Sequence, residues 1–186
     1  ILGHCPDHVL ATHIKSHALF ELGDVDKAIV FLQKQTERRP NLAEFHAELG
    51  VLYARTKRPS EAARCFESAH ALLPSDTNLA FNLCKAWVDS EQGERAIPLL
   101  QPLCVGGDKE AEKLLLSRAL MDTQRPLEAI HWLDELTREF PENAAAWLLL
   151  GMVKMSINDL QEAEKCFRIT TGLAPGLAMA HEQLGA

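Results

Sequence analysis

The sequence lacks the features that identify nucleic-acid-binding and membrane-spanning proteins. It has no run of basic residues, and its 19 Lys and Arg are outnumbered by 26 Asp and Glu, for a net charge of −7. A nucleic-acid backbone is therefore not expected as a partner. The longest apolar stretch is the ten residues from Ala144 to Val153, about half of what a membrane-spanning helix needs. The sequence predicts no nucleic-acid partner and no membrane partner.

Targeting signals and paired cysteines are missing too. The opening stretch has neither Met nor a basic region before an apolar core, so we do not interpret it as a signal peptide. The five cysteines are an odd number and contain no Cys-x-x-Cys pair. This usage is typical of reduced thiols, and it predicts a cytoplasmic protein or one in another reducing compartment.

Catalytic and cofactor-binding motifs are also missing. The sequence contains no G-x-S-x-G, no phosphate-binding loop, no H-E-x-x-H and no glycine-rich nucleotide fingerprint. His13 and His17 are four residues apart, as are His4 and His8, and such pairs can hold zinc on a helix. No carboxylate or cysteine is clearly placed to complete either site, so we interpret them as solvated histidines. We predict no enzyme activity within these residues, no cofactor and no metal.

An internal repeat is the main positive signal. The 34-residue stretches Asn41–Pro74 and Glu142–Pro175 both contain Leu-Gly, then Glu-Ala, then Cys-Phe, and both end on Pro. Pro6, Pro40 and Pro74 are likewise 34 residues apart. A fixed period of this length indicates a solenoid built from repeated supersecondary units.

Each repeat has the pattern of two amphipathic helices. In Asn41–Pro74, Pro59 stands where a second helix begins, a position that tolerates its missing N–H. Asn41, followed three residues later by Glu44, predicts an N-cap with a capping box. Residues at helical spacing form one face of each segment. They are His46, Leu49, Gly50 and Tyr53 in the first segment, and Ala62, Phe66 and Ala69 in the second.

These residues in these places resemble the tetratricopeptide repeat. The match in residues 43–76 is Leu49, Gly50, Tyr53, Ala62, Phe66, Ala69 and Pro74, with His46 where Trp is usual. The match in residues 144–177 is Trp147, Leu150, Gly151, Ala163, Phe167 and Pro175, with departures at Lys154 and Thr170. The resemblance implies an all-α fold: a right-handed superhelix of antiparallel helix pairs whose first helices line the concave side.

The period divides the whole chain into one solenoid over residues 1–186. The expected repeats are 9–42, 43–76, 77–109, 110–143 and 144–177, with partial repeats at 1–8 and 178–186. Residues 1–6 look like the tail of a preceding repeat, and His181, Leu184 and Gly185 fall at first-helix positions of a sixth. We therefore expect a fragment of a longer tetratricopeptide repeat protein.

Small residues at fixed phase predict where paired helices touch. Gly50 and Gly151 should let the two helices of their repeats approach closely, with larger side chains filling the space around them. The residues in phase with them on the first helices are Ser16, Cys84 and Ser117, and those on the second helices are Ala28, Ala62, Ala96, Ala129 and Ala163.

The third repeat departs most from the pattern. Pro98 and Pro102 both fall within its second helix, and Pro102 removes a backbone hydrogen bond there. We predict that this helix bends or shortens and ends by about Leu103. The segment is either an irregular helix end or a hinge between two halves of the solenoid.

The face of each first helix opposite its core residues predicts a binding surface, which we call the first-helix wall. In the tetratricopeptide repeat family, which the sequence resembles, this face is the ligand-binding concave side. Its predicted members are Leu10, His13, His17 and Phe20; Glu44, Ala47, Val51 and Ala54; Asn78, Phe81, Lys85 and Val88; Ala111, Leu114, Arg118 and Met121; and Ala145, Leu148, Met152 and Met155. All four methionines of the chain, Met179 included, map to it. Methionine is common on adaptable binding surfaces.

We therefore predict a non-catalytic interaction scaffold that binds a peptide or amphipathic helix of a partner protein. The predicted groove residues are Leu114, Arg118, Met121, Leu148, Met152, Met155, Asn78, Asn82 and Lys85. The alternatives are the repeat arm of a larger enzyme, such as a bacterial sulfotransferase or glycosyltransferase, and a self-association module acting through uncapped ends. Capture of a chaperone's C-terminal carboxylate, known in the family, is not expected, because Ala47 and Val51 replace its Lys and Asn.

Overall fold

The computed structural model describes residues 6–106 and 109–185, and all regular secondary structure in these ranges is α-helical. The chain divides into two compact units, Ile1–Ser90 and Glu91–Ala186. The boundary falls between two helices and lies inside the predicted third repeat, 77–109. The prediction that one solenoid runs through residues 1–186 stays a prediction.

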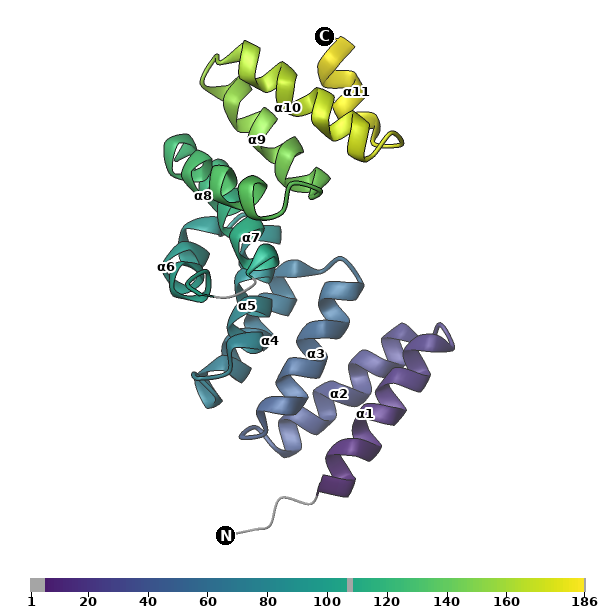
Figure 1. Ribbon diagram of the computed structural model, residues 1–186. Coiled ribbons are helices and arrows are strands. Elements are labelled where there is room, and N and C mark those ends of the chain that lie inside the picture. Colours follow the sequence, from purple (N-terminus) through teal and green to yellow (C-terminus); the bar gives the residue numbers. More distant parts are fainter. Residues whose placement is uncertain (1–5, 107–108, 186) are drawn as a thin grey trace. The chain divides into compact units, whose positions relative to one another are not determined.

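The first unit contains five helices in its described residues: α1 Pro6–Glu21, α2 Val25–Arg38, α3 Ala43–Arg55, α4 Pro59–Leu72 and α5 Thr77–Asp89. Each helix packs against the next along the chain, and α1 also contacts α3 (Figure 1). Pro6, which the sequence assigned to the tail of a preceding repeat, is instead the first residue of α1. Residues 1–5 lie outside the described part of the chain.

The second unit contains six helices in its described residues: α6 Gly93–Leu103, α7 Glu110–Asp122, α8 Pro126–Glu139, α9 Ala144–Ser156, α10 Leu160–Leu173 and α11 Ala178–Gly185. Consecutive helices again pack together, and the two first helices α7 and α9 are in contact (Figure 1). The predicted all-α fold of sequentially packed antiparallel helices is confirmed.

A left-handed residue closes the first helix of each repeat. Positive φ angles occur at Gly23, Lys57, Glu91, Gln124 and Asn158, which follow one another at intervals of 34 residues, or 33 in one case. After α3, the Lys57 N–H donates to the Ala54 carbonyl and the Arg58 N–H to the Tyr53 carbonyl. This is the Schellman arrangement that satisfies the last carbonyls of a helix. The tight turn fixes where each second helix begins.

The predicted close approach of paired helices at glycine is confirmed. A Cβ added to Gly50 would lie 2.9 Å from the ring of Phe66, and one added to Gly151 would lie 2.5 Å from the ring of Phe167. Both rings are buried. The alanines in phase on the second helices are buried as well, as are Ser16, Cys84 and Ser117. The repeat signature is thus a packing signature.

The N-cap that the sequence predicted for α3 is wrong. The N-cap of α3 is Leu42, in an extended conformation and without a side-chain hydrogen bond, so Asn41 lies one residue too early to cap the helix. The side chains that do cap helices are Asp76 on α5 and Asn143 on α9.

The helix α6 ends at Leu103, as its internal prolines predicted. A hinge role for the segment that follows stays a prediction.

A hydrogen bond from a side-chain ring N–H connects several first helices to the loops that precede them. The Trp147 indole donates to the Pro141 carbonyl at 2.8 Å, and the imidazole Nε2 atoms of His46 and His181 lie 2.9 Å from the carbonyls of Pro40 and Pro175. The contact spans six residues each time. The helix α11 therefore repeats the local geometry of a first helix, as the position of His181 predicted. The side chains of Leu184 and Gly185 lie outside the described residues.

Candidate functional site

In the second unit, the predicted groove residues lie at the surface. Leu114 and Met121 on α7 and Leu148 and Met152 on α9 are half-buried, and the Met155 side chain is 40% exposed. Arg118, also exposed, lies 3.9 Å from Asp122 through its Nε atom. None of these residues belongs to the packed core of the unit. The helices α7 and α9 therefore present an apolar first-helix wall with one cation.

In the first unit, the structure brings two of the three predicted groove residues together. Asn82 and Lys85 on α5 line the same pocket, whereas the exposed Asn78 does not line it. The prediction for Val88 is wrong, because this side chain is 3% exposed and lies in the core.

Two pockets lie along the first helices of this unit. The larger of the two has a volume of about 580 Å³ and opens between α3 and α5. Val51 and Ala54 give it an apolar floor on the α3 side. Its ionisable lining consists of three cationic side chains, Arg55, Lys57 and Lys85, and one carboxylate, Asp89. The charges that line the pocket are therefore mainly positive, in a chain whose net charge is −7, although Arg55 also pairs with Glu21 outside the lining.

A smaller pocket of about 210 Å³ adjoins it between α1 and α3. Its lining is mainly apolar and includes Phe20, Leu32 and Leu52. At its rim the Glu48 carboxylate lies 2.7 Å from Nδ1 of His13 and accepts a 3.2 Å hydrogen bond from the Ser16 hydroxyl. Val51 and Arg55 line both pockets, so the two adjoin each other along the first-helix wall.

Arg55 is held in place between the two pockets. Its guanidinium stacks over the Phe20 ring at 3.8 Å from the centroid, and its Nη2 atom donates to a Glu21 oxygen at 3.3 Å. Stacking of this kind contributes about 0.5–1 kcal/mol at exposed sites. A guanidinium has five N–H donors in a fixed fork. The anchored group can therefore donate further hydrogen bonds into either pocket.

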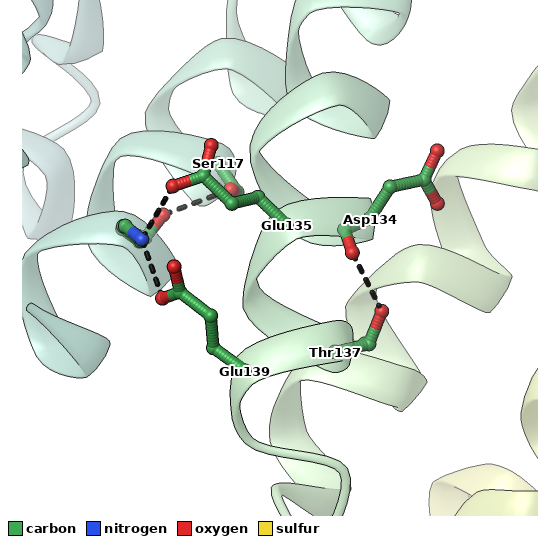
Figure 2. A network of polar contacts seen from close by, with 6 residues as sticks. Ser117, Asp134, Glu135, Thr137 and Glu139 are labelled. Carbon is green, nitrogen blue, oxygen red and sulfur yellow. Dashed lines mark hydrogen bonds and ion pairs between the residues drawn. The ribbon is translucent and has the colours of Figure 1, made fainter.

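The sequence did not reveal a charge cluster between α7 and α8, in which a buried lysine meets two partly exposed glutamates. The Lys113 side chain is 4% exposed, and its ammonium donates to Glu135 and Glu139 on α8, each at 2.6 Å (Figure 2). Burial opposes the charge of the ammonium, but the two carboxylates outweigh it and raise the pKa of Lys113. The sequence feature that could have indicated this cluster was Lys113 itself, because this cation lies three residues before the core residue Leu116.

The cysteines in the described part of the chain are packing residues. Cys84, Cys104 and Cys166 are buried, and Cys65 is half-buried. Burial raises the pKa of Cys65 and Cys166 to about 11 and that of Cys104 to about 12. Because the thiolate is the reactive form, these thiols are poor nucleophiles at neutral pH. Cys5 lies outside the described residues.

The histidine pairs take ordinary surface positions where they are described. The rings of His13 and His17 lie 6.3 Å apart, and each also faces a glutamate. Within residues 6–106 and 109–185, no group of three or more His, Cys, Asp or Glu side chains is arranged to hold a metal ion. The pair formed by His4 and His8 lies outside the described side chains. No described helix is long and apolar enough to cross a membrane.

The fold and the wall define an α-helical repeat protein built from helix–turn–helix units. Models of the tetratricopeptide repeat match residues 12–42, 43–76 and 114–185. The chain belongs to the tetratricopeptide repeat family.

Solved structures share this fold at low sequence identity. The crystal structure of YrrB, a TPR protein with an unusual peptide-binding site, superposes with a TM-score of 0.78 and 19% identity, over 92% of this chain and 89% of that one. A MamA structure from Desulfovibrio magneticus RS-1 superposes with a TM-score of 0.81 and 17% identity, over 92% of this chain and 97% of that one.

One curated relative is similar over a short stretch. The Drosophila melanogaster protein O-mannosyl-transferase Tmtc3 is 43% identical over 54 residues, which are 28% of this chain and 6% of that protein. The match therefore spans less than a tenth of that relative's length.

Proposed function

We propose that this chain is a non-catalytic scaffold that binds a peptide or amphipathic helix of a partner protein on its first-helix wall. The observation that carries the proposal is the position of the wall residues. Large apolar side chains at the predicted phase are left at the surface of α7 and α9, and two adjoining pockets open at the same phase between α1, α3 and α5. The peptide-binding site in the description of YrrB supports the same class of partner.

In the second unit the binding energy would come from apolar contacts. Met121, Met152 and Met155 lie on α7 and α9, which contact each other. Burying one Met or Leu side chain stabilises a complex by roughly 1.5–3 kcal/mol. A few such contacts suffice for micromolar affinity once ordering of the peptide is subtracted. Arg118 would orient the segment by pairing with an acidic group.

We expect Met155→Glu and Met152→Glu to weaken partner binding about 10- to 100-fold, because each buries a charge where an apolar contact formed. The thermal midpoint should stay nearly unchanged, since neither residue is in the core. The test is to select peptides from a random phage-displayed library on the immobilised chain. The selected peptide is then titrated by fluorescence anisotropy against wild type and both variants.

Leu127→Glu is the matched control, because Leu127 is 75% exposed on α8 and lies outside the predicted wall. It should bind the selected peptide as wild type does. Variants at Met152 and Met155 that unfold would show that these residues are core. Variants that fold and bind normally would place the partner elsewhere in this unit, and loss of binding only in Leu127→Glu would move it to α8.

A second candidate is that the chain is the repeat arm of a larger glycosyltransferase. The similarity to a stretch of a protein O-mannosyl-transferase favours this alternative over the others. Sequencing the gene on both sides of this segment tests the idea, because a transferase domain in the same reading frame would support it. Its absence would leave the scaffold alone.

We propose that the scaffold works in the cytoplasm or another reducing compartment, because the described cysteines form no disulfide. Self-association through the ends of the chain remains the third candidate. Light scattering over a concentration series separates it from partner binding, because only self-association raises the mean mass with concentration.

A further inference from the structure

We propose that the two adjoining pockets of the first unit recognise an extended segment carrying an apolar side chain and, a few residues away, an aspartate or glutamate. This inference rests on the proposed function and names the chemistry of its partner. The smaller pocket would take the apolar side chain. The carboxylate would lie in the larger pocket between α3 and α5.

The charge of the larger pocket selects an acidic group. Arg55, Lys57 and Lys85 converge on it against the single carboxylate of Asp89. In the described part of the chain, neither Lys57 nor Lys85 makes an ion pair or side-chain hydrogen bond. Arg55 is already oriented by Phe20 and Glu21, so little side-chain entropy is lost when it binds. Charge-assisted bonds from such groups are about twice as strong as neutral ones.

The other lining groups suit a peptide backbone. The Asn82 side chain is half-buried in the larger pocket and makes no hydrogen bond to a described residue. An amide with both a donor and an acceptor can pair with the N–H and C=O of an extended chain. Because Val51 and Arg55 line both pockets, one segment can occupy both without leaving the wall. The wall therefore offers an apolar subsite, a backbone contact and an anion subsite in that order.

An acidic side chain fits better than a chain terminus. Ala47 and Val51 stand where a clamp for a terminal carboxylate would need Lys and Asn. The cations are instead Arg55 at the end of α3, Lys57 in the turn that follows it, and Lys85 within α5. We therefore assign the anion subsite to an internal Asp or Glu.

The test uses fluorescent decapeptide pools, acetylated and amidated at their ends, with one fixed Leu and otherwise Ala, Ser and Gly. Each pool also fixes Glu, Gln or Lys about two to four residues from the Leu, a spacing that extended chain can span between adjoining pockets. A further Gln pool ends in a free carboxylate. Anisotropy titrations of the full chain give the affinities at about 0.05 M and 0.5 M salt.

We expect a Glu pool to bind about tenfold more tightly than its Gln and Lys counterparts, and high salt to remove most of the difference. Lys85→Glu should remove the preference for Glu, and Lys85→Gln should reduce it. The control Arg38→Glu makes the same charge change at an exposed site on α2 outside both pockets, and it should alter the affinity by less than about twofold.

Equal affinity for the Glu, Gln and Lys pools would overturn the inference, as would a Lys85→Glu variant that keeps the preference. Binding of only the free-carboxylate pool would assign the subsite to a chain terminus and also overturn it. Binding that Met155→Glu abolishes and Lys85→Glu leaves intact would refute this inference while the proposed function stands. If no pool binds, the inference fails, and the library selection decides the proposed function separately.

Discussion

Lys113→Ala should lower the free energy of unfolding by about 2–4 kcal/mol. The substitution removes two charge-assisted hydrogen bonds of 2.6 Å from a side chain that is 4% exposed. It also leaves Glu135 and Glu139 facing each other without a cation and opens a cavity where the lysine stem lay. Breaking a buried ion pair costs about 3–5 kcal/mol, and we reduce that range because both glutamates are partly exposed. Urea denaturation followed by circular dichroism measures the loss.

The matched control is Lys165→Ala, which breaks an exposed Lys–Glu pair within α10. It should change the stability by less than about 0.5 kcal/mol, as surface pairs usually do. Lys113→Met keeps the stem and removes the charge, so the difference between Met and Ala isolates packing. An effect of Lys113→Ala no larger than that of Lys165→Ala would show that the cluster does not stabilise the fold.

The same cluster contributes a pH dependence. The hydrogen bond from Lys113 outweighs burial and lowers the pKa of Glu135 below its ordinary value of 4.5. A carboxyl whose pKa is lowered by folding stabilises the protein above its unfolded pKa, and the contribution is lost as the pH falls through the folded pKa. Wild type should therefore lose stability below about pH 4.5 more steeply than Lys113→Ala.

Gly151→Ala should destabilise the chain by about 1–2 kcal/mol, although alanine is the better helix former. An added Cβ would lie 2.5 Å from the Phe167 ring, which is 2% exposed and has no room to swing away. Overpacking of a core costs about 1–3 kcal/mol, and the gain in helix propensity of about 1 kcal/mol offsets part of it. Thermal and urea denaturation report the net change.

Gly172→Ala is the control that should change sign. Gly172 lies inside α10, and a Cβ added there would meet nothing within 4 Å. Only the helix propensity acts, so this variant should be more stable than wild type by up to about 1 kcal/mol. Adding Phe167→Leu to Gly151→Ala should restore part of the loss. Equal effects of the two alanines would refute the close contact.

The repeat period was enough to predict most of the fold, because the residues that define the period are packing residues. Gly50 and Gly151 predicted their close contacts with Phe66 and Phe167, and the prolines of α6 predicted its end at Leu103. The cap at Asn41 was misplaced by one residue, because a capping box specifies residue types and not the φ and ψ angles that decide where a helix begins.

The candidate site was less predictable from sequence. Periodicity placed Asn82 and Lys85 on one face, but it did not reveal that Arg55 and Lys57 join them. Those two residues lie at a helix end and in a left-handed turn, where the helical phase no longer applies. The cluster around Lys113 was missed for a related reason: its partners are 22 and 26 residues away, on the next helix. Contacts between helices depend on packing that the period alone does not give.

Amide chemical-shift mapping will show whether the first-helix wall binds the partner. The library-selected peptide is titrated into the ¹⁵N-labelled chain and the shifted amides are assigned. We predict shifts confined to the wall and groove residues, around Val51, Asn82 and Lys85 in the first unit or Met121, Met152 and Met155 in the second. Shifts centred instead on the second helices, at residues such as Val30, Leu127 and Leu160, would contradict it.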